Sequence, residues 1–180
     1  MRIVSGKYKS RRINHVEDNK TRPTTDKNRE NIFNIIGPYF YGGNALDLFC
    51  GSGALGIEAL SRGIDFCYFC DTSTQAIKVL NKNLKDLKIL DFKLYQRDYK
   101  KVLELFNNEG IKLDLILLDP PYKFMNMNEI LNLISQYQIL NDDGIIVTET
   151  SKDEEINDSF AGFSKSKETN YGISKVCVFK

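Results

Sequence analysis

The segment NALDLFCGSGALG, residues 44–56, constrains the fold of this chain more than any other part of the sequence. It begins with a mainly apolar run, 45–49, which has the length and composition of a buried strand. Three glycines follow, and apolar side chains then recur at helical spacing from Leu55 onwards. A strand that passes through a glycine-rich turn into a helix is typical of α/β folds, where the turn brings backbone N–H groups up to a ligand.

The three glycines, Gly51, Gly53 and Gly56, satisfy the spacing G-x-G-x-x-G of dinucleotide-binding loops. Asp71 closes the next expected strand, 20 positions after Gly51, where an acid that binds ribose hydroxyls is expected. The glycine spacing alone is weak evidence, because a purely structural turn also uses glycines. Combined with the flanking strand, the flanking helix and Asp71, it predicts a cofactor that carries adenosine.

Strands and helices alternate after this motif. Strands are expected at 45–49, 66–71, 92–96, 113–118 and 144–148, with helical patterns between them. Such alternation predicts a parallel sheet. The last two expected strands, 163–169 and 173–179, are separated by only three residues, so they must pair antiparallel. We therefore expect an α/β fold with a seven-stranded, mostly parallel sheet that ends in an antiparallel hairpin.

The N-terminal segment is basic. Residues 2–16 are expected to form a small β-hairpin, which divides the chain into an extension, 1–20, and a main domain, 21–180. Residues 1–30 hold nine Lys or Arg and four acids, hence +5, whereas the other 16 basic (25 − 9) and 20 acidic residues (24 − 4) give −4. This asymmetry favours a polyanionic partner, although charge alone fits a solvated leader equally well. The residues expected to contact the polyanion are Arg2, Lys7, Lys9, Arg11, Arg12 and Arg22.

The remaining composition excludes several classes of protein. No apolar run approaches the ~18 residues of a membrane span, and the N-terminus lacks the apolar core of a signal peptide. Cys67 and Cys70 form a C-x-x-C, but within an expected strand, where positions three apart face opposite sides. No second cysteine pair or nearby histidine completes a metal site. We therefore expect a cytoplasmic protein without a metal or a membrane contact, whose four cysteines are buried thiols.

A second motif, Asp119-Pro120-Pro121-Tyr122, follows the expected strand 113–118. The carboxyl ends of parallel strands form one crevice, so this tetrapeptide is expected beside the glycine loop. Proline nitrogens carry no hydrogen, so the turn presents two acceptors, the Asp119 carboxylate and the Pro120 carbonyl, and then an aromatic ring. This set suits a planar exocyclic NH2 group, which it can hold with the nitrogen lone pair aimed at an electrophilic methyl group.

These features resemble those of a known family. A parallel sheet finished by an antiparallel hairpin is similar to the class I S-adenosylmethionine-dependent methyltransferase fold. The blocks MRIVSGKYKSRR, TRPTTDKNRE, DLFCGSGALGIEALSRG and LDPPY, in this order, resemble the RsmD family over essentially the whole chain. The DPPY block alone is shared with many amino-methyltransferases. The resemblance implies transfer of a methyl group from S-adenosylmethionine to the N2 amine of a guanine in 16S ribosomal RNA.

The resemblance also implies a role for each matching residue. Asp71 would bind the ribose hydroxyls of the cofactor and Asp98 its adenine amine. The other implied cofactor-binding residues are Asp47, Phe49, Gly51 and Gly53. The implied catalytic residues, which would hold the guanine, are Asp119, Pro120, Pro121 and Tyr122. Arg22 would face RNA near the active site. The expected partner is 16S ribosomal RNA, free or within an assembling small ribosomal subunit, and a monomer is expected.

Other functions share part of this pattern. The first alternative is an adenine or cytosine amino-methyltransferase acting on DNA or RNA, but those acting on DNA commonly carry a sizeable target-recognition region, for which 180 residues leave no room. A dehydrogenase would share the glycine loop and Asp71 but would need a second catalytic domain. A noncatalytic RNA-binding module would not need the DPPY motif. Protein-glutamine methyltransferases usually begin that motif with Asn rather than Asp119.

Overall fold

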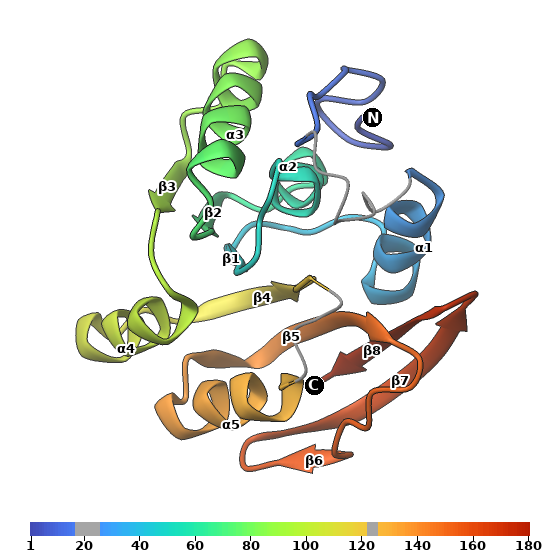
Figure 1. Ribbon diagram of the computed structural model, residues 1–180, viewed down its shortest axis with the longest axis vertical. Helices are drawn as coiled ribbons and strands as arrows, with labels where there is room; N and C mark the ends of the chain where they lie inside the picture. Colours follow the sequence, from blue (N-terminus) through green and yellow to red (C-terminus); the bar gives the residue numbers. More distant parts are fainter. Residues whose placement is uncertain (17–25, 122–125) are drawn as a thin grey trace.

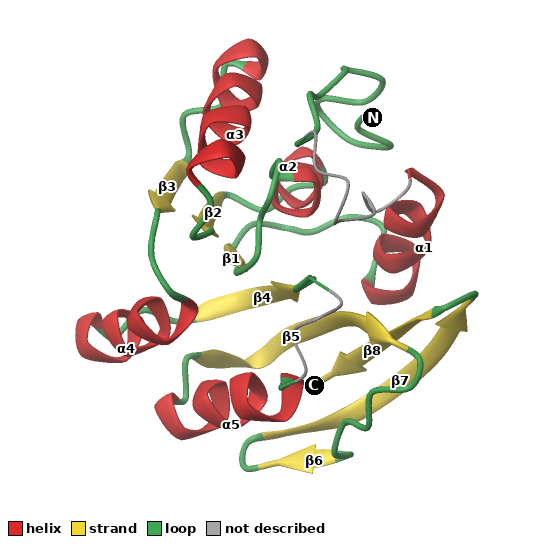
Figure 2. Cartoon of the chain, viewed as in Figure 1, coloured by secondary structure: helices red, strands yellow, loops and turns green. Residues whose placement is uncertain are grey.

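A computed structural model describes residues 1–16, 26–121 and 126–180, and it shows one twisted sheet between two layers of helices (Figure 1). Strands and helices alternate from α1 to β5, and three further strands complete the chain (Figure 2). The helices are α1 (Asp26–Ile36), α2 (Ala54–Ser61), α3 (Thr74–Leu87), α4 (Tyr99–Glu109) and α5 (Met127–Tyr137). The strands are β1 (Asn44–Asp47), β2 (Phe66–Cys70), β3 (Phe92–Tyr95), β4 (Leu113–Leu118), β5 (Leu140–Ser151), β6 (Ser159–Phe160), β7 (Phe163–Tyr171) and β8 (Ser174–Phe179).

The described strands form one sheet of eight in the order β3-β2-β1-β4-β5-β8-β7-β6. Strands β1 to β5 pair in parallel, whereas β8, β7 and β6 pair antiparallel. The predicted parallel sheet with its terminal antiparallel hairpin is confirmed. The eighth strand is β6, which the seven-stranded prediction lacked because two residues are too few to show a period.

Each face of the sheet packs against its own helices. Helices α1, α2 and α3 cover one face, and α4 and α5 cover the other (Figure 1). Strand β4 divides its side chains between the two, with Leu115 and Leu117 in the first core and Ile116 and Leu118 in the second. This explains why its sequence is a continuous apolar run.

The cysteines follow the same geometry. Cys67 lies in the core under α2 and α3, and Cys70 lies in the core on the opposite face. All four cysteines are buried free thiols, as the sequence predicts. Burial raises the pKa of each thiol, to about 12 for Cys70, so these side chains behave as small apolar residues.

The N-terminal segment, residues 1–16, folds back on itself without forming regular strands. One antiparallel bridge joins Arg2 to Arg12, and the backbone N–H of Ile3 donates to the Arg11 carbonyl at 3.0 Å. The predicted hairpin is therefore reduced to a single bridge around a wide turn. Ile3 and Ile13 are buried in the core under α2. The division into residues 1–20 and 21–180 stays a prediction, but this segment shares the core of the domain.

A buried ion-pair cluster holds the N-terminal segment against α1 and α2. Glu58, which is fully buried on α2, accepts from Arg29 Nε at 3.2 Å and from Arg62 Nε at 2.8 Å. The same carboxylate accepts from the backbone N–H groups of Val4 and Ser5, both at 2.9 Å. Because every charge in this cluster is paired, it can stay ionised away from water.

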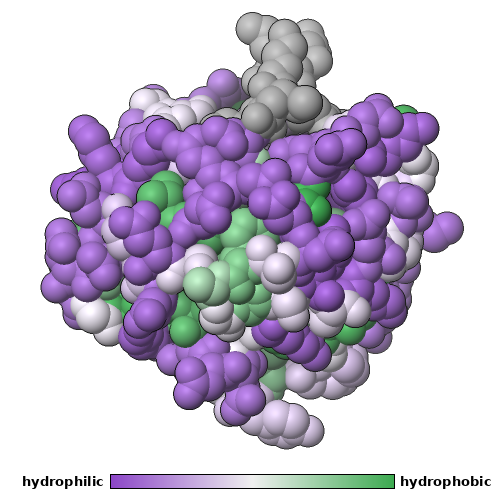
Figure 3. Space-filling view, turned by 90° about the horizontal axis from the view of Figure 1, so that it is seen from below, coloured by the Kyte–Doolittle hydropathy of each residue, from purple (hydrophilic) through white to green (hydrophobic). Residues whose placement is uncertain are grey.

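The molecular face in Figure 3 is mostly hydrophilic, with a small less polar area near its centre. This fits the packing of most apolar side chains into the two cores. None of the helices in the described ranges combines the length and apolar character that a membrane crossing requires.

Candidate active site

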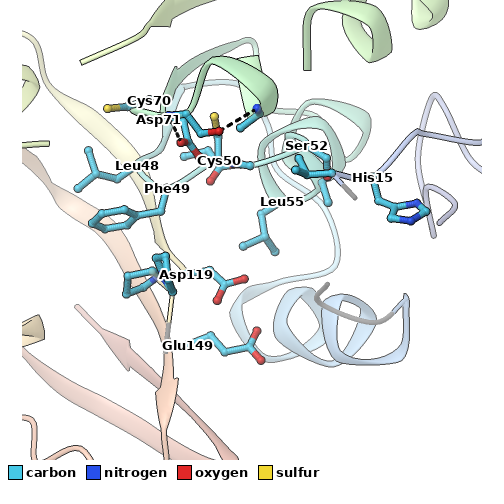
Figure 4. Close-up of a pocket in the computed structure, with 18 of the residues that line it drawn as sticks. His15, Leu48, Phe49, Cys50, Ser52, Leu55, Cys70, Asp71, Asp119 and Glu149 are labelled. Carbon is cyan, nitrogen blue, oxygen red and sulfur yellow. Dashed lines mark hydrogen bonds between the residues drawn. The ribbon is translucent and has the colours of Figure 1, made fainter. Parts of the chain in front are cut away.

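A cleft of about 710 Å³ opens at the carboxyl ends of the parallel strands. The strand order reverses between β1 and β4, which is the point where ligands bind in open α/β sheets. The glycine loop after β1, Asp71 after β2, Asp98 after β3 and the Asp119 turn after β4 all line this cleft (Figure 4). The cleft therefore brings together the described residues of the predicted cofactor and target sites except Gly53, which does not line it.

The three glycines of the loop have different structural roles. Gly56 lies on α2, and a Cβ there would meet Phe69 Cε1 at 2.4 Å, so the helix can approach β2 only because the side chain is absent. Gly53 has a φ of 81° and packs against Leu80, so a Cβ there would be both strained and crowded. Gly51 has a φ of 50°, and no heavy atom lies within 4 Å of where its Cβ would stand. The backbone at Gly51 therefore faces open space.

Acidic side chains hold the glycine loop in place. Asp71 Oδ2 accepts from the Gly51 N–H at 2.9 Å, and Asp71 Oδ1 accepts from the Ser73 N–H at 2.8 Å. Ser73 in turn caps α3 by accepting from Ala76 N, as its position before the helix predicts. The partly exposed Asp71 carboxylate has lone pairs left for a ligand, since each oxygen can accept twice.

Asp47 is the most buried acid of the cleft, with an exposed fraction of 1%. Its Oδ2 accepts from the Gly56 N–H at 2.9 Å, in the first turn of α2. The pKa of Asp47 is raised from 3.8 to about 7, mainly by burial; the Gly56 N–H opposes this shift, and the carboxylates of Asp119 and Asp71 add to it. The cleft thus concentrates negative charge around a carboxylate that has little water to stabilise it.

The far end of the cleft carries Phe49, Asp98 and Tyr99. The rings of Phe49 and Tyr99 lie 5.8 Å apart between centroids. Asp98 is exposed and caps α4, where its side chain accepts from Lys100 N at 2.9 Å. An aromatic pair beside a carboxylate gives this end an apolar face and an acceptor, which suits a purine.

The Asp119 turn begins directly after β4. Asp119 is half-buried, Pro120 is buried and Pro121 is exposed, and all three line the cleft. Tyr122, the fourth residue of the predicted motif, lies outside the described residues. Asp119 is close enough to Asp47 for its charge to raise the pKa of that carboxyl. The glycine loop and the turn after β4 therefore belong to one electrostatic site.

Sequence reasoning missed one acid of the cleft, Glu149. This residue lies in β5, lines the cleft and is only 5% exposed. Figure 4 shows its carboxylate beside that of Asp119, with both pointing to the same side. The rule that placed Asp119 could have found it, because Glu149 directly follows the expected strand 144–148. His15 is exposed at the rim of the cleft.

The predicted RNA-binding residues of the N-terminal segment are all exposed. They are Arg2, Lys7, Lys9, Arg11 and Arg12. Arg11 Nη2 also donates to the Asp86 carbonyl at 2.9 Å. Arg22 lies outside the described residues. The same segment reaches the cleft, because Met1, His15 and Val16 line its wall.

Among the described residues, no three His, Cys, Asp or Glu side chains gather in a way that could hold a metal ion.

Comparisons with known proteins show which family this chain belongs to. The family model described as conserved hypothetical protein 95 matches residues 1–180. The Bacillus subtilis protein YlbH, named as a candidate rRNA methyltransferase, is 42% identical over 181 residues, which span 100% of this chain and 98% of YlbH. Ribosomal RNA small subunit methyltransferase D of Escherichia coli K12 is 30% identical over 150 residues, 83% of this chain and 74% of that protein.

A solved structure shows the same fold. The Escherichia coli protein yhhF, described as a candidate methyltransferase, superposes with a TM-score of 0.86 at 28% identity, over 99% of this chain and 96% of that one. The sheet order, the glycine loop and the Asp119 turn thus occur in a chain that matches these relatives over nearly all of its length. This chain therefore belongs to the RsmD family of RNA methyltransferases and has the α/β methyltransferase fold that its motifs imply.

Proposed function

We propose that this protein transfers a methyl group from S-adenosylmethionine to the N2 amine of a guanine in 16S ribosomal RNA. The observation that carries the proposal is that the glycine loop and the turn Asp119–Pro121 open into one acid-lined cleft. One motif is suited to a nucleoside cofactor and the other to a conjugated amine. A methyl transfer needs both within one cavity.

The charge of the cleft supports S-adenosylmethionine over a dinucleotide. The N–H groups of Gly51 and Gly56 already donate to Asp71 and Asp47, and the Gly53 N–H donates to the Cys50 carbonyl. The loop therefore has few free donors for a pyrophosphate, and its acids would repel one. Bound S-adenosylmethionine supplies the methyl group from a cationic sulfonium and also carries an ammonium group, so this cleft complements its charge.

Each acid of the cleft has a role in this proposal. Asp71 accepts hydrogen bonds from the ribose hydroxyls while it keeps Gly51 in position. Asp47 attracts the ammonium group of the methionine end, near Gly51 and Gly53. Phe49 and Asp98 hold the adenine, the ring by contact and its amine by a hydrogen bond. These roles follow from the family resemblance and from the position of each side chain in the cleft.

Asp119 and the Pro120 carbonyl hold the two hydrogens of the guanine amine. The nitrogen lone pair of guanine is delocalised into the ring, so the free amine is a poor nucleophile. Two fixed acceptors favour a pyramidal nitrogen, and this interaction strengthens towards the transition state. The nitrogen becomes cationic as the N–C bond forms, and it then loses a proton readily. Asp119 therefore needs to be a well-placed acceptor more than a strong base. Tyr122 is expected to stack on the guanine.

The exposed cations of the N-terminal segment support an RNA substrate. Phosphate contacts position a nucleic acid without reading its sequence, and the segment borders the cleft. The proposed partner is 16S ribosomal RNA, free or within an assembling small subunit, and the proposed setting is a monomer in the cytoplasm. The alternative is an amino-methyltransferase that acts on adenine or cytosine in DNA or RNA.

The test compares Asp119→Asn with Asp119→Ala in single-turnover transfer of labelled methyl to a 16S ribosomal RNA fragment. Asn keeps an acceptor oxygen, so measurable turnover is expected. Ala leaves a buried N–H without a partner, which costs about 1–3 kcal/mol, or roughly ten- to hundredfold in rate. Both variants should bind S-adenosylmethionine nearly as the parent does. If Asn is as inactive as Ala, Asp119 acts as a general base; label on N6-methyladenosine would reject guanine as the target.

A further inference from the structure

We propose that Glu149 selects guanine by accepting a hydrogen bond from N1–H of the target base, beside the amine held by Asp119. This inference rests on the proposed function and names the residue that sets the base specificity of the same site. It comes from the position of Glu149 on β5 and from the chemistry of the base edge.

The sheet places Glu149 next to Asp119. Leu118 of β4 pairs in parallel register with Thr148 of β5, and Asp119 and Glu149 are the next residues of their chains. Neighbouring strands lie about 4.8 Å apart. Alternation puts both carboxylates on the face that also holds Leu117 and Val147. Figure 4 shows the two carboxylates side by side and pointing in the same direction.

The backbone of Glu149 is firmly held. It pairs with Val176 of β8 in the antiparallel part of the sheet, while the preceding Thr148 pairs with β4. The residue is 5% exposed, although it lines the cleft. A nearly buried carboxylate on a central strand is suited to reading the edge of a base, because its backbone is held by the sheet and burial restricts the rotamers of its side chain.

The donor pattern of guanine matches two adjacent carboxylates. Its Watson–Crick edge carries N1–H and the N2 amine side by side, both of them donors. Asp119 can accept from the amine, and the longer Glu149 side chain can accept from N1–H. Adenine presents an N1 lone pair next to its amine, so its N1 would face the carboxylate of Glu149 and be repelled. Asp119 and Glu149 together therefore favour guanine, and repulsion between the Glu149 carboxylate and the N1 lone pair disfavours adenine.

The experiment compares guanine with a base that keeps the N2 amine but lacks the N1–H donor and O6. One 16S ribosomal RNA fragment carries guanine at the methylated position, and a second carries 2-aminopurine, which keeps the amine but has a lone pair at N1. The value of kcat/KM is measured on both RNAs for the parent, Glu149→Gln and Glu149→Ala. Glu104→Gln is the matched control, because Glu104 is exposed on α4 and does not line the cleft.

The parent is expected to favour guanine over 2-aminopurine by at least roughly tenfold, the value of one hydrogen bond to a charged group. Glu149→Gln can donate its amide to N1 of 2-aminopurine, so the preference should fall by at least about tenfold; Glu149→Ala should reduce it as well. Contacts to guanine O6 also contribute to the preference, but they are common to parent and variants and cancel in this comparison. A purely structural role would lower both rates together and leave their ratio unchanged.

A guanine preference that is the same in the parent and both Glu149 variants would overturn the inference. Equal kcat/KM values of the parent protein on the two RNAs would also overturn the inference. That measurement uses the parent protein alone, so it does not depend on whether a variant folds. Either outcome leaves the proposed function intact, provided that digestion of the guanine RNA yields N2-methylguanosine. If that nucleoside is missing with the parent protein, the proposed function itself fails. Glu104→Gln should keep the ratio of the parent.

Discussion

Asp47→Asn should stabilise the protein in the absence of cofactor and weaken its affinity for S-adenosylmethionine. The Asp47 carboxylate is buried beside Asp71 and Asp119, and its pKa is about 7 rather than 3.8. An acid whose pKa is raised by folding binds protons more tightly in the folded state. Between pH 4 and 7 the folded state therefore holds more protons than the unfolded state, and the unfolding free energy falls as the pH rises.

The magnitude follows from the same shift. A pKa raised from 3.8 to about 7 corresponds to an upper bound of about 4 kcal/mol, at 1.36 kcal/mol per decade. This loss of unfolding free energy, caused by ionisation of the buried Asp47, is absent below pH 4, grows as the pH rises and is complete above pH 7. Asparagine carries no charge but keeps an acceptor oxygen for the Gly56 N–H, which Asp47 accepts at 2.9 Å. The stability gained by Asp47→Asn should therefore be near zero at pH 4 and largest at pH 8.

Urea unfolding of both proteins, followed by circular dichroism from pH 4 to pH 8.5, measures this difference directly. Asp91→Asn, at an exposed aspartate, is the control for the chemical change itself, and the pH dependence of Asp47→Asn is compared with it. Calorimetry at pH 8 should show weaker binding of S-adenosylmethionine to Asp47→Asn, because the ammonium group loses its counter-charge. A stability difference that does not change with pH would refute the reasoning, since it would mean that Asp47 is equally ionised in both states.

Three further predictions concern other parts of the molecule. Asp71→Ala should weaken S-adenosylmethionine binding at least roughly tenfold while the protein stays folded, and unchanged affinity in calorimetry would contradict the ribose assignment. Glu58→Gln should lower the unfolding free energy by about 3–5 kcal/mol in urea titrations, because it removes the carboxylate that Arg62 pairs with and leaves the buried Arg29 with only the part-exposed Asp26; a loss below 1 kcal/mol would contradict that pairing. Replacing Lys7 and Lys9 by Gln should weaken RNA binding and lower the salt slope of the affinity by up to about 2, with cofactor affinity unchanged; an unaltered slope would remove these side chains from the RNA surface.

Exchanging single charges tests RNA binding by the N-terminal segment more cleanly than removing the segment. The sequence predicts a hairpin extension that is separate from the main domain. Ile3 and Ile13 instead lie in the core, and Met1 and Val16 line the cleft. Removing the segment would therefore disturb folding and the cofactor site together, whereas exchanging exposed lysines does not.

The parallel half of the fold could be predicted because each of its elements has a local signal. Residues 113–118 form a strand at the predicted bounds, since an apolar run of six is long enough to cross the sheet and is covered on both faces. Ser73 caps α3 because its hydroxyl stands at the right position to accept from Ala76 N. The candidate site followed from the glycine loop, Asp71 and Asp119, since each comes directly at or after a strand end.

The other features of the fold depend on tertiary contacts that leave no local pattern in the sequence. Glu58 looks like an ordinary helix residue, and only the folded chain reveals that it pairs with Arg29 and accepts from Val4, which is 54 positions away. Strand β5 begins at Leu140, before the expected residue 144, because it pairs with β4 across an irregular register. Tertiary pairing decided these features, and the sequence pattern could not show them.

The Glu58 cluster also determines when the beginning of the chain can fold during synthesis. Residues 1–16 leave the ribosome before α2, but the carboxylate that binds the Val4 and Ser5 N–H groups belongs to that helix, which ends at Ser61. A contact that spans more than 50 residues cannot form until that helix has emerged, and closing so long a loop has an entropic cost. The N-terminal segment therefore cannot reach its final position before residues 54–61 have been made and have emerged. Until then its basic side chains are held close to the ribosome that is making them.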